Sequence, residues 1–150
     1  MLDDLVRDQI QSEIQQIEDL FVAFSELLDK SATIDPNAIE RTALGSVLHS
    51  FYTGLEGIFL TVAKRVDEKV PSGERWHRDL LDQITAPTDL RPTLISEKAK
   101  ESLREYLAFR HFFRQAYAYV LHWEEMRSLV SDLKPTWTRI KTEIEMWLND

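Results

Sequence analysis

The sequence contains no cysteine, and it has only four glycines and five prolines among 150 residues. The missing cysteine excludes disulfide bonds and thiolate zinc sites, and it is consistent with a cytoplasmic protein. Glycine and proline interrupt helices, so their scarcity leaves room for long ones. No apolar run approaches the roughly 18 residues that a membrane-spanning helix needs. No basic region followed by an apolar run opens the chain. We therefore expect neither a membrane segment nor a signal peptide.

Several kinds of functional motif are also missing. The four histidines form no His-x3-His pair and no cluster with carboxylates at ligand spacing, so we expect no metal site. There is no glycine-rich phosphate loop, which argues against nucleotide hydrolysis, and no serine has an identifiable base. The sequence therefore predicts that the protein works without a metal and without a cofactor.

Acidic residues outnumber basic ones, and the net charge of −8 argues against broad nonspecific binding of nucleic acid. The charge is unevenly distributed, since residues 1–30 carry eight acidic residues against two basic ones. Residues 104–114 instead carry Arg104, Arg110 and Arg114 against a single acid, a local balance of +2. A cationic pocket in an acidic protein is compatible with a narrow RNA-binding site, and equally with a site that binds the acidic surface of a partner.

Hydrophobic residues make up 43% of the chain, so residues 1–150 are long enough and apolar enough for one folded domain. Apolar residues recur at steps of three and four, which is typical of amphipathic helices. Asp35 is expected to cap the second helix with Pro36 at its first position, and Pro135 to kink the last helix. The predicted fold class is all-α, an antiparallel bundle of four or five helices. The predicted helices span residues 3–30, 35–69, 74–85, 96–121 and 122 onward.

Three glycines, Gly45, Gly54 and Gly57, lie inside the predicted second helix. Each costs up to about 1 kcal/mol relative to alanine, so we expect another backbone to approach closely there, above all at Gly54 and Gly57. Glu56 lies between these two among apolar neighbours. A buried carboxylate needs a partner, and an arginine of the helix over 96–121 is a natural one. The alternative is a position on the helix surface.

The most informative stretch runs from Phe109 to Tyr117, where arginines, a histidine and aromatic residues crowd every face of a predicted helix. Arginine and histidine bind phosphates and aromatic rings stack on bases, so the mixture indicates a nucleotide or RNA site. A core helix whose arginines reach solvent along their apolar stems would explain the same residues equally well.

This stretch resembles the signature of the HEPN superfamily, and specifically of HepT-like ribonuclease toxins, whose motif is Arg-x4-His-x-Tyr. Arg110 and Tyr117 fall on the outer positions of the motif, and Gln115 stands at the position of the histidine. Three earlier blocks resemble segments that precede the motif in HepT-like chains, so the resemblance covers residues 40–130. These blocks are residues 48–56, residues 76–81 and Arg91-Pro92.

The resemblance implies a HEPN-like homodimer whose composite active site, at the two-fold interface, cuts tRNA or mRNA without a metal. It also implies a partner, a small MNT-type nucleotidyltransferase antitoxin that can silence the toxin by attaching AMP to the motif tyrosine. That tyrosine would be Tyr117, with Tyr119 as an alternative acceptor. Arg110 would hold the scissile phosphate. The possible supporting residues are His111, Arg114, Arg104 and Glu56.

Gln115 departs from the motif at the position of the expected base. Metal-free RNA cleavage needs a group that takes the proton from a ribose 2′-hydroxyl, and histidine suits this because its pKa, about 6.5, lies near neutral pH. A glutamine amide can hold RNA but cannot act as a base, and losing a base typically costs about a hundred- to ten-thousand-fold in rate. Three explanations stay open: a natural degenerate member, an engineered substitution, or His111 acting as the base together with Arg104.

Three hypotheses for function follow, and whether the chain is an enzyme is open. The first is a HepT-like toxin whose endonuclease activity is weakened or lost through Gln115. The second is a non-catalytic helical bundle that binds a nucleotidyltransferase, and the third is a purely structural bundle. Of the remaining histidines, His77 is expected either to line the site or to lie on the surface. His49 is expected to pack beside the core with Phe51 and Tyr52.

Overall fold

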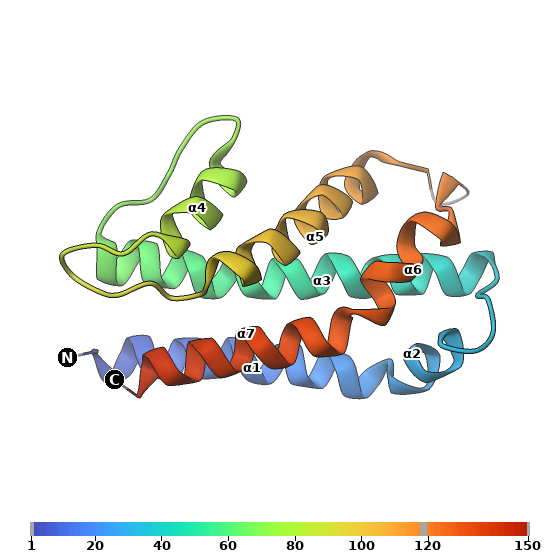
Figure 1. The fold of residues 1–150 in the computed structure, drawn as a ribbon, viewed down its shortest axis with the longest axis horizontal. Helices are drawn as coiled ribbons and strands as arrows, with labels where there is room; N and C mark the ends of the chain where they lie inside the picture. The colour runs from blue at the N-terminus through green and yellow to red at the C-terminus, as the bar shows by residue number, and fades with distance from the viewer. Residues whose placement is uncertain (1, 118–119, 150) are drawn as a thin grey trace.

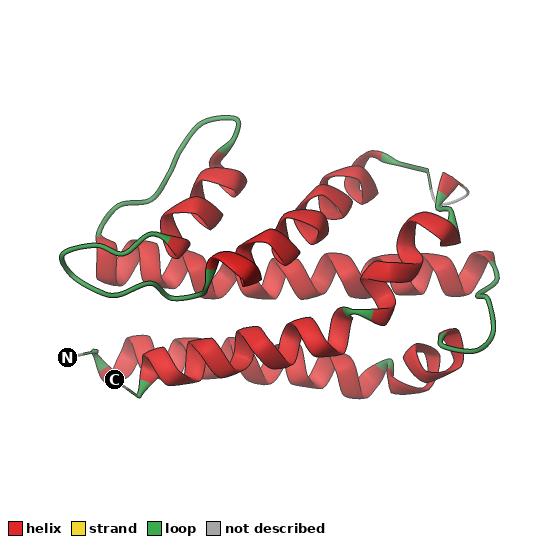
Figure 2. Ribbon diagram, in the orientation of Figure 1, coloured by secondary structure: helices red, strands yellow, loops and turns green. Residues whose placement is uncertain are grey.

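The computed structural model describes residues 2–117 and 120–149, and within these residues the chain is helical and carries no strand (Figures 1 and 2). The expected all-α fold class is confirmed, although the described chain divides into more helices than predicted. None of these described helices combines the length and the apolar character that crossing a membrane requires. The elements are α1 (Asp4–Ala23), α2 (Ser25–Ser31), α3 (Ala38–Val62), the π-helical turn η1 (Ala63–Asp67), α4 (Trp76–Thr85), α5 (Glu97–Gln115), α6 (Trp123–Ser131) and α7 (Leu133–Leu148).

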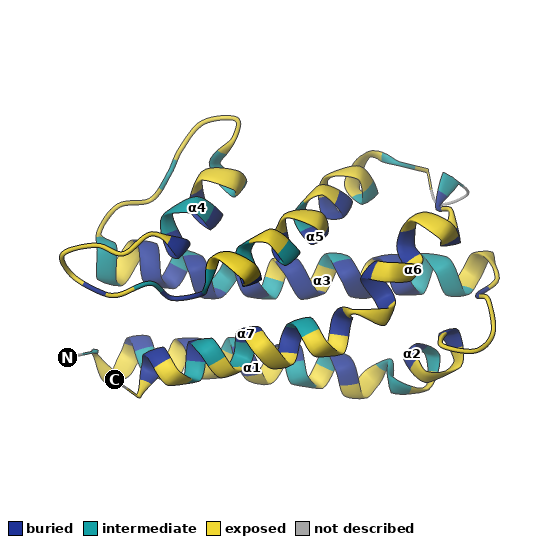
Figure 3. Ribbon diagram, viewed as in Figure 1, coloured by how far each residue is buried: buried dark blue, intermediate teal, exposed yellow. Residues whose placement is uncertain are grey.

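Helix α3 is the centre of the bundle, and it packs against α1, α4, α5 and α6 (Figure 1). Buried positions run along most of its length because other helices cover it on more than one side (Figure 3). An aromatic cluster joins α3 to α1, α5 and α7. The ring of Phe51 lies 6.0 Å from Phe21 of α1, 5.4 Å from Tyr106 of α5 and 6.1 Å from Trp137 of α7, measured between centroids. Such edge-to-face contacts stabilise the core beyond simple burial.

The predicted first helix contains a break. Helix α1 begins after Asp3, whose carboxylate accepts a hydrogen bond from the backbone N–H of Leu5 at 2.8 Å. Its apolar stripe is buried against α3, as the pattern predicts. Helical geometry is interrupted at Phe24, and α2 follows at once. The interruption redirects the chain so that Leu28 and Ser31 of α2 are buried.

Helix α3 begins later than predicted, and its cap is Asn37 rather than Asp35. The Asn37 side chain accepts a hydrogen bond from the backbone N–H of Glu40 at 2.8 Å. The Glu40 carboxylate in turn accepts one from the backbone N–H of Asn37 at 3.0 Å. This reciprocal pair satisfies two donors where an aspartate cap alone would satisfy one. The prediction that Pro36 occupies the first helical position was therefore wrong.

The predicted close packing at the glycines of α3 is present, but side chains rather than another backbone approach them. A Cβ atom placed on Gly54 would lie 2.8 Å from Cγ1 of Ile17 in α1, and one on Gly57 would lie 3.2 Å from the carboxyl carbon of Glu13. Both distances are shorter than an ordinary van der Waals contact between carbon atoms. Helix α1 can therefore pack this closely only because α3 has no side chain at these two positions.

The C-terminal part of the chain differs from the prediction in two places. Helix α5 ends at Gln115 rather than near residue 121. Leu121 is buried and its carbonyl accepts a hydrogen bond from Nε of Arg41 at 3.0 Å, so the chain leaves the axis of α5 to reach α3. The expected kink at Pro135 is instead a break at Asp132. Pro135 lies in the first turn of α7, where its missing N–H has no partner within that helix.

Candidate functional site

The first residue of the motif, Arg110, is buried between α5 and α3. Its Nε donates a hydrogen bond to Oγ1 of Thr53 at 3.1 Å, and its Nη2 lies 3.8 Å from Oε1 of Glu56. Only 11% of the Arg110 side chain is exposed. Glu56 is buried as well, so the contact expected between this carboxylate and an arginine of α5 is present, and Glu56 is not a surface residue. Two groups of α3 thus fix the guanidinium.

The second oxygen of Glu56 binds a residue of α4. Nδ1 of His77 lies 2.6 Å from Oε2 of Glu56. An ionised carboxylate only accepts hydrogen bonds, so we assign the proton of this bond to Nδ1, which leaves the Nε2 lone pair of the neutral ring unused by Glu56. The indole of Trp76 stacks on the imidazole, with centroids 3.6 Å apart and planes inclined by 29°. The structure therefore places His77 inside the site, with 25% of its side chain exposed.

His49 also faces α5 rather than the neighbours on its own helix. Its ring centroid lies 5.7 Å from that of Phe113. Burial lowers the pKa of His49, the positive charges of Arg110 and Arg114 lower it further, and the negative charge of Glu56 opposes them without reversing the shift. The expectation that His49 packs beside the core with Phe51 and Tyr52 missed this contact. A second imidazole, mostly neutral at neutral pH, therefore lies near Arg110 and Arg114.

The rest of the motif lies on the outside of the protomer. Gln115 is the last residue of α5 and is exposed, and Tyr117 follows the helix with 74% of its surface exposed. His111 and Arg114 are exposed too. Five helical positions correspond to a rotation of about 140°, so Gln115 does not share the inner side of α5 with Arg110. One protomer therefore buries Arg110 and leaves Gln115 and Tyr117 on its surface.

Arg104, the residue expected to work with His111, contacts α4. Its Nη2 lies 3.7 Å from Oδ1 of Asp82, which also pairs with Nζ of Lys100 at 2.9 Å. No interaction between Arg104 and His111 occurs among the residues that the structure describes. The alternative acceptor Tyr119 lies outside the described residues.

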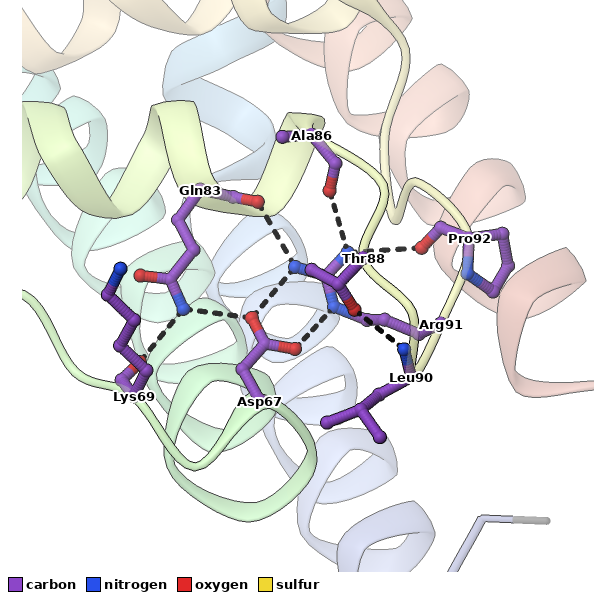
Figure 4. A network of polar contacts seen from close by, with 8 residues as sticks. All are labelled: Asp67, Lys69, Gln83, Ala86, Thr88, Leu90, Arg91 and Pro92. Carbon is purple, nitrogen blue, oxygen red and sulfur yellow. Dashed lines mark hydrogen bonds and ion pairs between the residues drawn. The ribbon is translucent and has the colours of Figure 1, made fainter.

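The Arg91-Pro92 block forms a structural anchor (Figure 4). Nε and Nη2 of Arg91 donate to the two oxygens of Asp67 at 2.7 and 2.8 Å. The remaining N–H groups reach the carbonyls of Ala86, Pro92 and Gln83 at 3.2, 3.0 and 3.1 Å. All five donors of the guanidinium are thus satisfied inside the protein, which leaves none for a ligand.

The carboxylate of this anchor is held in its ionised form. Burial disfavours the charged form of Asp67, but hydrogen bonds from Arg91 and Gln83 outweigh burial and hold the pKa of Asp67 below its usual value. The Gln83 amide completes the anchor, because its Nε2 donates to Oδ2 of Asp67 and to the carbonyl of Lys69, both at 2.8 Å. The anchor fastens η1 and the end of α4 to the loop that precedes α5 (Figure 4).

The fold and the site define a helical bundle in which a buried glutamate joins an arginine and a histidine from two other helices. Among the described residues, no group of three or more histidine, aspartate and glutamate side chains is placed to hold a metal ion. A model of the HepT-like protein family matches residues 43–150. The chain therefore belongs to the HepT-like protein family, and the matched segment contains Arg110, Glu56 and His77. Neither a curated protein nor a solved structure matches the chain.

Sequence reasoning did not assign Thr53, which binds Arg110, or His49, which contacts Phe113, to the site, although a signal was present. His49, Tyr52, Thr53 and Glu56 recur at steps of three, one and three, which places them on one face of α3. Once Glu56 is assigned to Arg110, the other three positions are expected to face the same helix. Tyr52 is the most deeply buried of these polar residues, and its hydroxyl has no hydrogen-bond partner among the described residues. Burial, followed by the charge of Glu56, raises the pKa of Tyr52.

Proposed function

We propose that this protein is the toxin of a toxin–antitoxin pair and that its active form is a homodimer that cuts RNA without a metal. The observation that carries the proposal is the Arg110 guanidinium, which Thr53 and Glu56 hold in place within the segment that matches the HepT-like family. A fixed cation stabilises the charge that develops on a phosphate without reorganising during the reaction. The planar fork of arginine also matches two phosphate oxygens at once.

Gln115 weakens this activity in the present chain. The residue is exposed at the end of α5, where it can donate and accept hydrogen bonds to RNA. Its amide cannot take up a proton near neutral pH, so it does not replace the histidine of the family motif as a base. We therefore infer an endonuclease that binds RNA and cleaves it slowly.

The antitoxin in this proposal is an MNT-type nucleotidyltransferase that silences the toxin at Tyr117. The phenol oxygen of Tyr117 bonds to the α-phosphorus of ATP, pyrophosphate leaves, and the phenol proton passes to solvent or to a base of the enzyme. The 74% exposure of Tyr117 supports the assignment, because a transferase must reach its acceptor. Mixing the protein with its cognate transferase and ATP should raise its mass by whole AMP units, and Tyr117→Phe should abolish the increase. An unchanged mass with an active transferase would remove this modification from the proposal.

A second function is favoured by a different observation. Within one protomer, Glu56 already neutralises Arg110, and Gln115 stands where a base is expected. These two features also suit a non-catalytic bundle that binds a nucleotidyltransferase and no longer cuts RNA. Tight binding of the transferase with no RNA cleavage by any variant would favour this alternative.

Cleavage of tRNA and mRNA by the unaltered protein and by Gln115→His separates the two functions. The histidine variant should cleave roughly a hundred- to ten-thousand-fold faster, because it regains the base of the family motif. Arg110→Lys, which keeps the charge beside Glu56 but loses the planar fork, should reduce cleavage by both proteins. Arg139→Lys makes the same change at an exposed position of α7 and should have no effect. Absence of cleavage by both the unaltered protein and Gln115→His would contradict the nuclease assignment.

A further inference from the structure

Glu56 holds two groups at once, the guanidinium of Arg110 at one oxygen and the imidazole of His77 at the other. A buried carboxylate that accepts the Nδ1–H of a histidine fixes the ring and stabilises the imidazolium that forms when Nε2 takes up a proton. The stacked indole of Trp76 restricts the plane of the same ring. His77 is thus oriented as a general base would be, and it shares Glu56 with Arg110, the cation proposed to bind the phosphate. The family motif includes neither His77 nor Trp76.

We propose that His77 is the general base of this protein, in the role that Gln115 cannot fill. The inference rests on the RNA endonuclease activity proposed above. Nε2 of His77 takes the proton of a ribose 2′-hydroxyl while the oxygen bonds to the adjacent phosphorus. The bond from phosphorus to the 5′-oxygen breaks, and that oxygen takes up a proton from the imidazolium or from water. The products are a 2′,3′-cyclic phosphate and a 5′-hydroxyl, and Arg110 balances the charge on the phosphate during the transfer.

The other histidines fit the role less well. Among the described residues, His77 is the only histidine with a carboxylate partner. His111 and His122 are exposed, and His122 is the N-cap residue of α6 but its side chain makes no capping hydrogen bond. Burial and two arginines disfavour the protonated form of His49. The charge of Glu56 favours that form, but among the described residues the hydrogen bond of Glu56 to a histidine goes to His77 and not to His49. Because His49 nevertheless lies near Arg110, it is the rival that the experiment must exclude.

The decisive variants keep the fold and remove only the proton acceptor. In His77→Asn the side-chain amide can still donate a hydrogen bond to Glu56, so the buried carboxylate keeps a partner, but no group replaces Nε2. His122→Asn makes the same change at the exposed histidine and serves as the matched control, and His49→Asn tests the rival. His77→Ala opens a space in which added imidazole can replace the missing ring. Each full-length variant is assayed for cyclic-phosphate ends on tRNA and mRNA, and urea unfolding verifies that it is folded.

The proposal expects slow cleavage by the unaltered protein and a loss of roughly a hundred- to ten-thousand-fold in His77→Asn. His122→Asn should keep the activity, His49→Asn should lose less of it than His77→Asn, and imidazole should restore cleavage to His77→Ala. A general base replaced by free imidazole gives this rescue, whereas a residue that only supports the fold does not.

The Gln115→His variant separates failure of this inference from failure of the endonuclease assignment. If Gln115→His cleaves RNA but the unaltered protein does not, or if His77→Asn cleaves as fast as the unaltered protein, the endonuclease stands and His77 is not its base. A loss confined to His49→Asn, or a His77→Ala variant that imidazole does not rescue, overturns the assignment of His77 in the same way. If neither Gln115→His nor the unaltered protein cleaves, the endonuclease assignment fails and the inference fails with it.

Discussion

Replacing Arg91 with methionine should destabilise the protein strongly, because Arg91 holds the structural anchor around Asp67. The Arg91 guanidinium uses all five donors, and both it and the Asp67 carboxylate are buried. Methionine has a similar length and fills much of the same space, so the main change is the loss of the charge and of the hydrogen bonds. Asp67 would then keep only the amide of Gln83 as a side-chain partner.

The size of the effect follows from the cost of an unpaired buried charge. Removing one member of a buried ion pair typically costs about 3–5 kcal/mol in the free energy of unfolding. For a domain of this size each kcal/mol lowers the melting temperature by roughly 2–4 °C, so the melting temperature should fall by about 6–20 °C. Urea unfolding followed by circular dichroism measures the free energy, and a thermal melt measures the temperature.

Two further variants make the measurement specific. Arg104→Met removes an exposed guanidinium that pairs with Asp82 at 3.7 Å, and such surface pairs contribute only about 0–1 kcal/mol. Combining Arg91→Met with Asp67→Leu removes both charges and should recover part of the lost stability. If Arg91→Met costs less than about 1 kcal/mol, or no more than Arg104→Met, the anchor does not stabilise the fold in the way that we describe.

Three other predictions concern the fold. Gly54→Ala should lower the free energy of unfolding by about 1 kcal/mol in urea titrations, because the clash with Ile17 outweighs the gain in helix propensity, and an unchanged or higher value would contradict the close packing. Tyr106→Phe should cost about 1 kcal/mol in the same assay, because its hydroxyl donates to the carbonyl of Leu129 at 2.7 Å, and a neutral change would show that this bond contributes nothing. Hydrogen bonds outweigh burial and lower the pKa of Asp67 in the folded protein. The ionised carboxylate therefore stabilises the fold fully above the pKa of an aspartate in the unfolded chain, about 3.9. This contribution to the free energy of unfolding is lost as the pH falls through the lower pKa of the folded protein. The stability gap between the unaltered protein and Asp67→Asn should therefore shrink below about pH 4, and a constant gap would refute the linkage.

The existence of the main helices and their buried faces was predictable because both depend on the periodicity of apolar residues, whereas the helix breaks were not. The apolar stripe of α1 and the serine cap of α5, where Ser96 accepts a hydrogen bond from the backbone N–H of Ala99 at 3.1 Å, both follow from the sequence. The breaks at Phe24 and Asp132 do not, because the step of three and four continues across them. They depend on which partner each half of the helix meets in the folded protein. The end of α5 is similar, since the bond between Arg41 and the carbonyl of Leu121 spans eighty positions.

The candidate site was predictable only where one residue demanded a partner. A carboxylate among apolar residues required a cation, and that requirement led to the contact of Glu56 with Arg110. His77 lies twenty-one positions from Glu56 on a separate helix, and nothing in its local sequence reveals that the two side chains meet. The Arg91 block was noticed only as part of the resemblance, and the contacts of Arg91 with Asp67 show that it has a structural role. Resemblance predicted the family, but only the contacts show which polar residues are held inside the protein.

Helices α1 and α2 precede the segment that defines the family, yet α1 covers one long side of α3. A fragment trimmed to residues 43–150 would leave that side without the cover of α1, with Gly54 and the ring of Phe51 losing their contacts to Ile17 and Phe21, and would tend to aggregate. The packed helical bundle is thus larger than the segment that the family model matches.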